Sequence, residues 1–159
     1  MPFRQWSRFF RERAFAERHT KVCKVDIPYL PISPRSNAMK NQWINWFEIP
    51  ATNLARASTF YETIFGLSLH KMDAGPLQMA IFPSSGASGA LVQGPSYVPS
   101  EHGPLLYLDA SPAIQEVLDR VEPAGGRILQ NKKMISEAIG YMGLIIDSEG
   151  NRIALMAKA

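Results

Sequence analysis

The chain has 159 residues, of which 46% are hydrophobic and 19% are charged, enough for one domain with a buried core. Its single cysteine, Cys23, excludes an intrachain disulfide framework and a zinc site built from several cysteines. No apolar run reaches the roughly 18 residues that a membrane-spanning helix needs. We therefore expect a cytoplasmic protein.

The net charge of +3 comes from the beginning of the chain. Residues 1–38 carry eight Lys and Arg against three Asp and Glu, whereas residues 39–159 carry nine against eleven. Phe3, Trp6 and Phe10 fall at helical spacing among arginines, and the prolines that follow favour an extended linker. We interpret residues 1–38 as a basic leader that is disordered or not native to the protein, and residues 39–159 as the folded domain.

Other interpretations of the leader stay open. Its pattern also suits an arm that contacts a membrane surface or nucleic acid, or an organellar presequence, although Glu12 and Glu17 argue against the latter. Ser36-Asn37-Ala38 before Met39 also resembles the remnant of a cleaved tag. We expect neither nucleic-acid binding nor membrane contact by residues 1–38.

The first half of the domain predicts one strand, one helix and three strands. Residues 43–49 are rich in strand formers and end at Pro50. Asn53 is placed to cap a helix over residues 54–65, and Gly66 ends it. Three short strands are then expected at residues 67–72, 77–82 and 89–93.

The same order recurs after a loop at residues 94–100. We expect a strand at 105–108 and a helix that starts at Pro112 and is capped by Ser111. Three further strands are expected at residues 127–129, 140–146 and 152–156. The modules, about residues 42–94 and 103–157, each leave one sheet face bare and must therefore pack together.

Several motifs within this repeat are distinctive: Ile49-Pro50 followed by Asn53-Leu54-Ala55-Arg56-Ala57, then Phe60-Tyr61, Phe65-Gly66-Leu67 and the closing run Asp147-Ser148-Glu149-Gly150-Asn151-Arg152-Ile153. With them, the chain from Trp43 to Met156 resembles the vicinal oxygen chelate superfamily, which includes glyoxalase I, bleomycin resistance proteins and extradiol dioxygenases. The resemblance implies an α+β fold in which two βαβββ modules form curled mixed sheets around a central cup. It indicates a fold more than an activity.

Enzymes of this family hold a divalent metal ion in the cup with His and Glu side chains, and the resemblance implies where these would lie. The first-strand position falls on Trp46 and the last-strand position on Ala154, neither of which can coordinate a metal. Residues 89–93 contain no His or acid, and His70 is expected to be an ordinary strand residue. His102 is the only candidate ligand, which is too few for a zinc site. We expect no metal or cofactor; the alternative is one divalent ion in a site completed across a dimer.

Without a metal, side chains of the cup would bind the ligand. Alternation along a strand places Glu48 on the same face as Trp46, and Tyr107 is expected to face the cup from the second module. We expect Trp46, Glu48 and Tyr107 to bind a polar or cationic small molecule. Glu48 is also a candidate general base, or it forms a structural ion pair with Arg56 or Arg152.

The sequence therefore predicts a small-molecule-binding protein that resembles the bleomycin resistance branch and forms a homodimer, as family members commonly do. The alternative is a metal-dependent glyoxalase-like lyase or dioxygenase, so whether the chain is an enzyme stays open. A third hypothesis is an interaction module whose basic leader docks to a membrane.

Overall fold

The computed structural model describes residues 44–84 and 88–158. The chain divides into two units, Met1–Lys40 and Asn41–Ala159, and all described residues belong to the second unit. The leader of residues 1–38, with the helix expected in it, lies outside the described residues.

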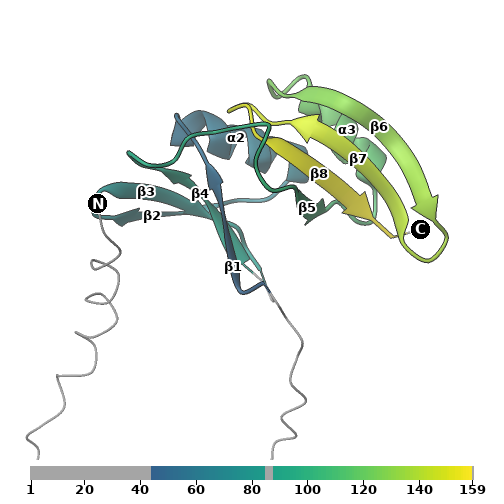
Figure 1. Cartoon of the computed structure of the whole chain (residues 1–159), viewed down its shortest axis with the longest axis horizontal. Helices are drawn as coiled ribbons and strands as arrows, with labels where there is room; N and C mark the ends of the chain where they lie inside the picture. Colours follow the sequence, from purple (N-terminus) through teal and green to yellow (C-terminus); the bar gives the residue numbers. More distant parts are fainter. Residues whose placement is uncertain (1–43, 85–87, 159) are drawn as a thin grey trace, which may run out of the picture. The chain divides into compact units, whose positions relative to one another are not determined.

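One order of elements occurs twice along the described chain (Figure 1). The first module contains β1 (Trp46–Pro50), α2 (Leu54–Phe65), β2 (His70–Ala74), β3 (Leu77–Ile81) and β4 (Ser88–Gln93). The second contains β5 (Leu106–Asp109), α3 (Ile114–Val121), β6 (Arg127–Ser136), β7 (Gly140–Ile146) and β8 (Arg152–Ala157). The β-α-β-β-β repeat is therefore confirmed.

Each module forms its own four-stranded mixed sheet. The strand orders are β1-β4-β3-β2 and β5-β8-β7-β6. In both sheets the first strand pairs in parallel with the last, and the other neighbours are antiparallel. Among the described residues no strand pair joins the two sheets, so they do not close into a single barrel (Figure 1). The α+β fold class is confirmed.

Helix α2 begins and ends where its local sequence requires. The Oδ1 of Asn53 accepts a hydrogen bond from the backbone N–H of Arg56 at 3.0 Å, which satisfies one of the free donors of the first turn. Gly66 follows the helix with φ 65°, a left-handed conformation that costs glycine little. The cap and the stop predicted for this helix are both confirmed.

Helix α3 begins two residues later than expected. Its N-cap is Ala113, which forms no side-chain capping hydrogen bond, and the helix starts at Ile114. Ser111 instead belongs to the turn after β5, where its backbone N–H donates to Oδ1 of Asp109 at 2.9 Å. The prediction that Ser111 caps a helix starting at Pro112 is therefore wrong, because Asp109 already organises this turn.

Two strands have other bounds than expected. Strand β2 covers His70–Ala74 rather than residues 67–72, since Leu67 and Leu69 pack against the core in the connection from α2. Strand β6 runs to Ser136 rather than ending at residue 129. It is exposed along most of its length, and pairing with β7, interrupted by three register shifts, holds it in the sheet.

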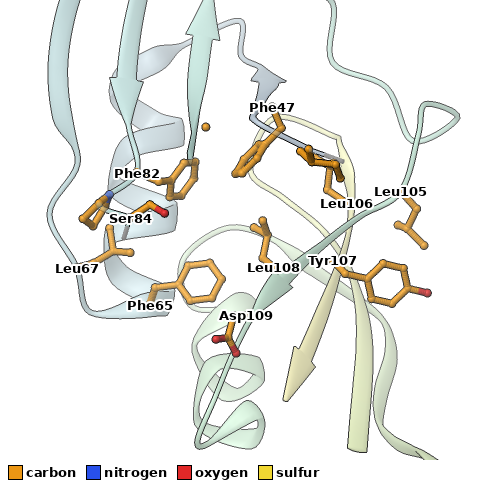
Figure 2. A pocket seen from close by; sticks show the side chains of 13 residues that line it. Phe47, Phe65, Leu67, Phe82, Ser84, Leu105, Leu106, Tyr107, Leu108 and Asp109 are labelled. Atoms are coloured by element: carbon orange, nitrogen blue, oxygen red, sulfur yellow. The ribbon is translucent and has the colours of Figure 1, made fainter. Parts of the chain in front are cut away.

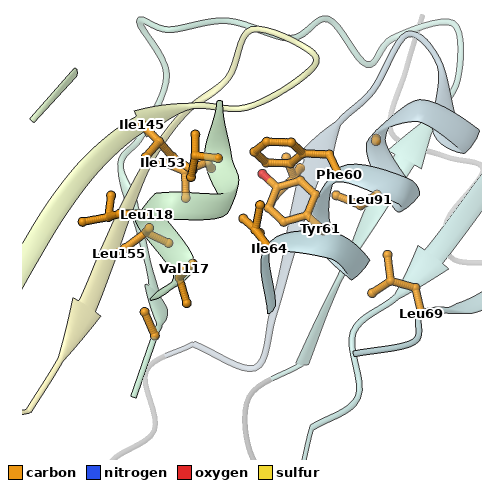
Figure 3. Close-up of a cluster of buried hydrophobic side chains, with 14 of the residues drawn as sticks. Phe60, Tyr61, Ile64, Leu69, Leu91, Val117, Leu118, Ile145, Ile153 and Leu155 are labelled. Carbon is orange, nitrogen blue, oxygen red and sulfur yellow. The ribbon is translucent and has the colours of Figure 1, made fainter. Parts of the chain in front are cut away.

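The two modules share one hydrophobic core (Figure 3). Its largest fully buried side chains come from both helices and both sheets: Ile49, Phe60, Tyr61, Ile64, Leu91, Ile114, Leu118, Ile145 and Leu155. Each helix covers the apolar face of its own sheet, and α2 contacts α3, so the two helices join the modules. Burial of each such side chain contributes about 1.5–3 kcal/mol, which makes this core the main source of stability.

The face of each sheet opposite its helix is called the far face here. Paired residues share a face, so the register places one set of side chains on it in the first sheet: Trp46, Glu48, Met72, Met79, Ile81, Ala90 and Val92. The corresponding set in the second sheet includes Tyr107, Asp109, Leu144, Ile146, Arg152, Ala154 and Met156. In the first sheet, Met79, Ala90 and Val92 form a second, smaller cluster against which Tyr97 packs.

The turn between β7 and β8 connects the second module to the first. Asp147 accepts a hydrogen bond from the hydroxyl of Tyr61 at 2.8 Å, and Asn151 donates through Nδ2 to the carbonyl oxygen of Pro50 at 2.8 Å. Asp147 and Asn151 are both buried. These polar contacts therefore hold the two modules in one arrangement at the edge of the shared core.

Candidate functional site

Strand β1 places Trp46 and Glu48 side by side on the far face of the first sheet. The indole Nε1–H of Trp46 donates to Oε1 of Glu48 at 3.1 Å, and the indole remains 43% exposed. Phe47 and Ile49 alternate with them and point to the core side. The structure thus brings together two of the three side chains predicted to bind a ligand.

Tyr97, from the loop after β4, adds a second donor to Glu48. Its hydroxyl donates a short hydrogen bond to Oε2 of Glu48. Burial raises the pKa of Tyr97 to about 12, and the hydrogen bond to Glu48 acts in the same direction. Sequence reasoning missed Tyr97, because this loop carries no periodic pattern that shows what it covers. Trp46, Glu48 and Tyr97 are called the Glu48 cluster below.

Glu48 does not form the ion pair considered from the sequence. Arg56 pairs instead with Glu149, at 2.7 Å between Nε and Oε1. Within residues 44–84 and 88–158, Arg152 takes part in no ion pair, and its Nε is buried without a hydrogen-bond partner. The structural ion pair is therefore a wrong prediction, and both oxygens of Glu48 accept hydrogen bonds from neutral donors instead. Its role as a general base stays a prediction.

Tyr107 lies in the second sheet, away from the Glu48 cluster. It pairs with Ala154 in the parallel register of β5 and β8, and it is 50% exposed. In the described part of the chain, no hydrogen bond or ring contact joins Tyr107 to Glu48 or Trp46. Its predicted role in ligand binding is therefore separate from theirs.

The positions at which the fold family holds a metal offer no matching donors. Trp46 and the fully buried Ala154 have no lone pair for a metal. Ala90, the neighbour of Glu48 on β4, cannot coordinate a metal either. His102 is exposed in a turn, where its backbone N–H donates to Ser100. In the ranges that the structure covers, no three His, Cys, Asp or Glu side chains converge. This set of side chains does not fit a divalent ion.

A pocket of about 510 Å³ opens between β1, the end of α2 and β5 (Figure 2). Its lining is mostly apolar: Ile44, Phe47, Phe65, Leu67, Phe82, Pro83, Ser84, Gly89 and residues 105–109. Figure 2 shows the side chains of Phe47, Phe82 and Leu108 directed toward one space, whereas Tyr107 points away from it. We call this the aromatic pocket. Its volume lies in the range of about 300–1,000 Å³ that is usual for organic ligands.

Ring contacts with the core hold the walls of the aromatic pocket. The centroids of Phe47 and Phe82 are 5.9 Å apart, and those of Phe82 and Tyr61 are 5.5 Å apart in an edge-to-face arrangement. Tyr61 also stacks on Phe65 at 6.4 Å and is itself fixed by Asp147. These are favourable geometries for aromatic pairs, so the pocket is largely preformed.

Gly89 leaves the room in which the ring of Phe47 lies. The two residues are partners in the register of β1 and β4, and a Cβ at Gly89 would overlap the ring of Phe47. Sequence reasoning concentrated on Trp46 and Glu48 and missed Phe47. The signal was present in the alternation itself, which sends Phe47 to the other face of the strand.

Asp109 is the one charged side chain among the described lining residues. Hydrogen bonds from the side chain and the backbone of Ser111 hold the pKa of Asp109 below its ordinary value, with a minor contribution from Lys158. The carboxylate is therefore ionised at neutral pH. The aromatic pocket combines apolar walls with a single negative charge.

No helix in the described ranges is both long enough and apolar enough to cross a membrane. The profile of the Glyoxalase/Bleomycin resistance protein/Dioxygenase superfamily matches residues 43–155. No curated protein sequence matches the chain.

Solved structures with a similar fold include a glyoxalase/bleomycin resistance protein/dioxygenase family enzyme from Burkholderia phytofirmans. It is 13% identical in sequence, with a TM-score of 0.54, and the match covers 72% of this chain and 98% of that chain. Another is a glyoxalase/bleomycin resistance protein from Albidiferax ferrireducens, with 15% identity, a TM-score of 0.55 and coverage of 72% and 98%. A glyoxalase I mutant from Zea mays has 16% identity, a TM-score of 0.53 and coverage of 70% and 45%. At these identities the likeness concerns the fold alone.

Proposed function

Because the chain belongs to the glyoxalase/bleomycin resistance protein/dioxygenase superfamily, we propose that it binds an organic small molecule in the aromatic pocket without a resident metal ion. The pocket itself carries this proposal, since its volume of about 510 Å³ and its walls of Phe47, Phe65 and Phe82 suit a ring-bearing molecule. Burial of apolar surface contributes about 25 cal/mol per Å², so such a molecule would gain affinity without a metal ligand. Membership of the superfamily does not by itself specify a ligand.

The side chains at the family's metal positions support the metal-free form of the proposal. Trp46 and Ala154 cannot coordinate an ion, and the oxygens of Glu48 accept hydrogen bonds from Trp46 and Tyr97. Trp46, Glu48 and Tyr107 stay predicted ligand contacts, but on the far faces rather than inside the aromatic pocket. Of the three, only Tyr107 also borders the pocket, and its ring points away from it.

The proposal includes a homodimer formed through the far faces. Trp46 and Met72 in the first sheet and Tyr107 in the second are large apolar side chains that are 42–50% exposed. The first far face carries the acid Glu48, and the second carries the base Arg152, with Asp109 at the end of β5. A two-fold axis that places the first sheet of one copy over the second sheet of the other would bring these opposite charges together.

Binding of a neutral fluorescent probe, N-phenyl-1-naphthylamine, to the full chain tests the proposed site. We expect saturable binding of one probe per chain that persists in EDTA. Leu67→Trp fills the pocket and should weaken binding at least about tenfold, while Leu129→Trp, on the exposed part of β6, should not change it. Absence of saturable binding, or equal effects of the two variants, would contradict the site. Binding that requires a stoichiometric metal would instead support the lyase or dioxygenase alternative.

A further inference from the structure

The charge at the edge of the aromatic pocket indicates which ligands it favours. Asp109 ends strand β5 and lies at the border of the pocket, below Leu108 and Phe65 (Figure 2). The other described lining residues carry no formal charge. A charged group on a ligand would therefore meet one fixed charge, and that charge is negative.

The carboxylate of Asp109 is positioned by its own turn. The backbone N–H of Ser111 donates to its Oδ1 at 2.9 Å, and the side chain of Ser111 also hydrogen-bonds to this carboxylate. None of the ion pairs formed by the described residues includes Asp109. Its register partner on β8 is Met156, an apolar residue. Lys158 adds a minor electrostatic effect but forms no ion pair with Asp109 among the described residues, so a cation that reaches this edge of the pocket would be its closest positive partner.

The aromatic walls favour the same sign of charge. The face of a phenylalanine ring is electrostatically negative and attracts ammonium groups that approach within about 6 Å of its centroid. Phe47, Phe65 and Phe82 all line the pocket. A ring face that meets the ligand therefore acts together with the carboxylate on a cation, and both disfavour an anion.

We propose that the aromatic pocket selects organic cations: molecules with an apolar, ring-bearing body in the pocket and an amine or quaternary ammonium group beside Asp109. This inference rests on the proposed function, because the body must occupy the same pocket. Asp109, a residue that sequence reasoning did not select, would be the determinant of specificity.

A matched set of probes tests this inference on the full chain: 2-(1-naphthyl)ethylamine, 2-(1-naphthyl)ethanol and 1-naphthylacetate, each measured by titration calorimetry. We expect the amine to bind about three- to tenfold more tightly than the alcohol, and the acid to bind most weakly. Asp109→Asn should reduce the amine to the level of the alcohol without changing the affinity for the alcohol. Asparagine keeps an oxygen for the N–H of Ser111, and urea midpoints would verify that the variant is folded.

Asp119→Asn provides the matched control, since it removes the same charge from an exposed position on α3. It should leave the preference for the amine unchanged. Equal affinities for amine and alcohol in the wild type, a preference that survives Asp109→Asn, or equal effects of the two variants would each overturn the inference while the proposed function stands. If none of the three probes binds, the proposed function itself fails.

Discussion

The hydroxyl of Tyr97 attaches the loop after β4 to strand β1 through Glu48. Tyr97→Phe removes the hydrogen bond and keeps the ring against Met79 and Val92. We expect the free energy of unfolding at pH 7 to fall by about 1 kcal/mol, measured by urea denaturation. Tyr107→Phe is the control: this ring is half-exposed, so removal of its hydroxyl should change stability by less than about 0.5 kcal/mol. Equal losses in both variants would contradict the role of the Tyr97 contact.

The same phenol makes stability depend on pH in the alkaline range. The pKa of Tyr97 is raised to about 12 in the folded chain, against about 10 for an unfolded tyrosine. Its contribution is therefore complete below about pH 10 and is lost as the pH rises toward 12. Tyr97→Phe should flatten the decline of stability over this range, as measured by urea midpoints at several pH values. Tyr61, whose pKa burial also raises, is present in both proteins. An unchanged slope would show that Tyr97 ionises normally.

At the scale of single residues, sequence reasoning worked where a strand supplies alternation. It placed Trp46 and Glu48 on one face, and the structure joins them at 3.1 Å. It did not find Tyr97 or Asp109, because their positions depend on the path of a loop and a turn. Its alternative of an ion pair between Glu48 and Arg56 is wrong, because Arg56 pairs with Glu149, 93 residues further along the chain.

Among the elements, the start of strand β4, at Gly89, controls the shape of the aromatic pocket. Gly89→Ala places a methyl group where the ring of Phe47 lies, so the ring must move. We expect a loss of about 1–3 kcal/mol in stability and weaker binding of the naphthylamine probe. Gly103→Ala is the matched control, since nothing lies within 4 Å of its Cβ position. Unchanged probe binding in folded Gly89→Ala protein would mean that Phe47 does not form a wall of the binding site.

The residues just before helix α2 are held by a residue from the other module. Glu149 accepts hydrogen bonds from the backbone N–H groups of Thr52 and Asn53 at 2.8 and 3.0 Å, and its side chain is only 1% exposed. Burial alone would raise the pKa of Glu149, but hydrogen bonds from Arg56, Thr52 and Asn53 outweigh it and hold the pKa below its ordinary value.

Glu149→Gln should therefore cost about 2 kcal/mol at pH 7, because the negative charge and its hydrogen bonds hold the helix start. A lowered pKa stabilises the fold above the unfolded value of about 4.5, and this contribution is lost as the pH falls through the lower pKa of the folded state. Thermal unfolding between pH 7 and pH 3 should show a shallower acid decline in the variant. Glu116→Gln, in an exposed pair with Arg120, should have little effect. An equally steep acid decline in Glu149→Gln would contradict this role.

The elements that were predicted well are those with strong local signals. Asn53 and Gly66 bound α2, and its apolar spacing survives in the structure. The start of α3 depends on the Asp109 turn, and the full length of β6 depends on pairing with β7. Neither contact produces a periodic pattern of hydrophobic residues in the sequence. The start of α3 and the end of β6 were therefore not predicted.

For the whole molecule, the repeated order of elements was sufficient to predict two modules and a shared core. The aromatic pocket was not predictable in the same way. Its walls come from Phe47, Phe65, Phe82 and Leu108, which meet only after the two modules pack. From the sequence we expected Trp46, Glu48 and Tyr107, which lie on the far faces, to line a cup. The pocket is instead lined by Phe47 and other side chains that pack against the core.

The proposed homodimer can be tested at this same scale by sedimentation equilibrium of the full chain. We expect a mass of about twice the 17.7 kDa of one chain at micromolar concentration. Met72→Lys places a charge among the apolar side chains of the first far face and should shift the mass toward the monomer. Val98→Lys is the control, because Val98 is 74% exposed in a loop and its replacement should leave the dimer intact. A monomer at all concentrations would show that the far faces do not pair, and their exposed Trp46 and Tyr107 would then need another partner.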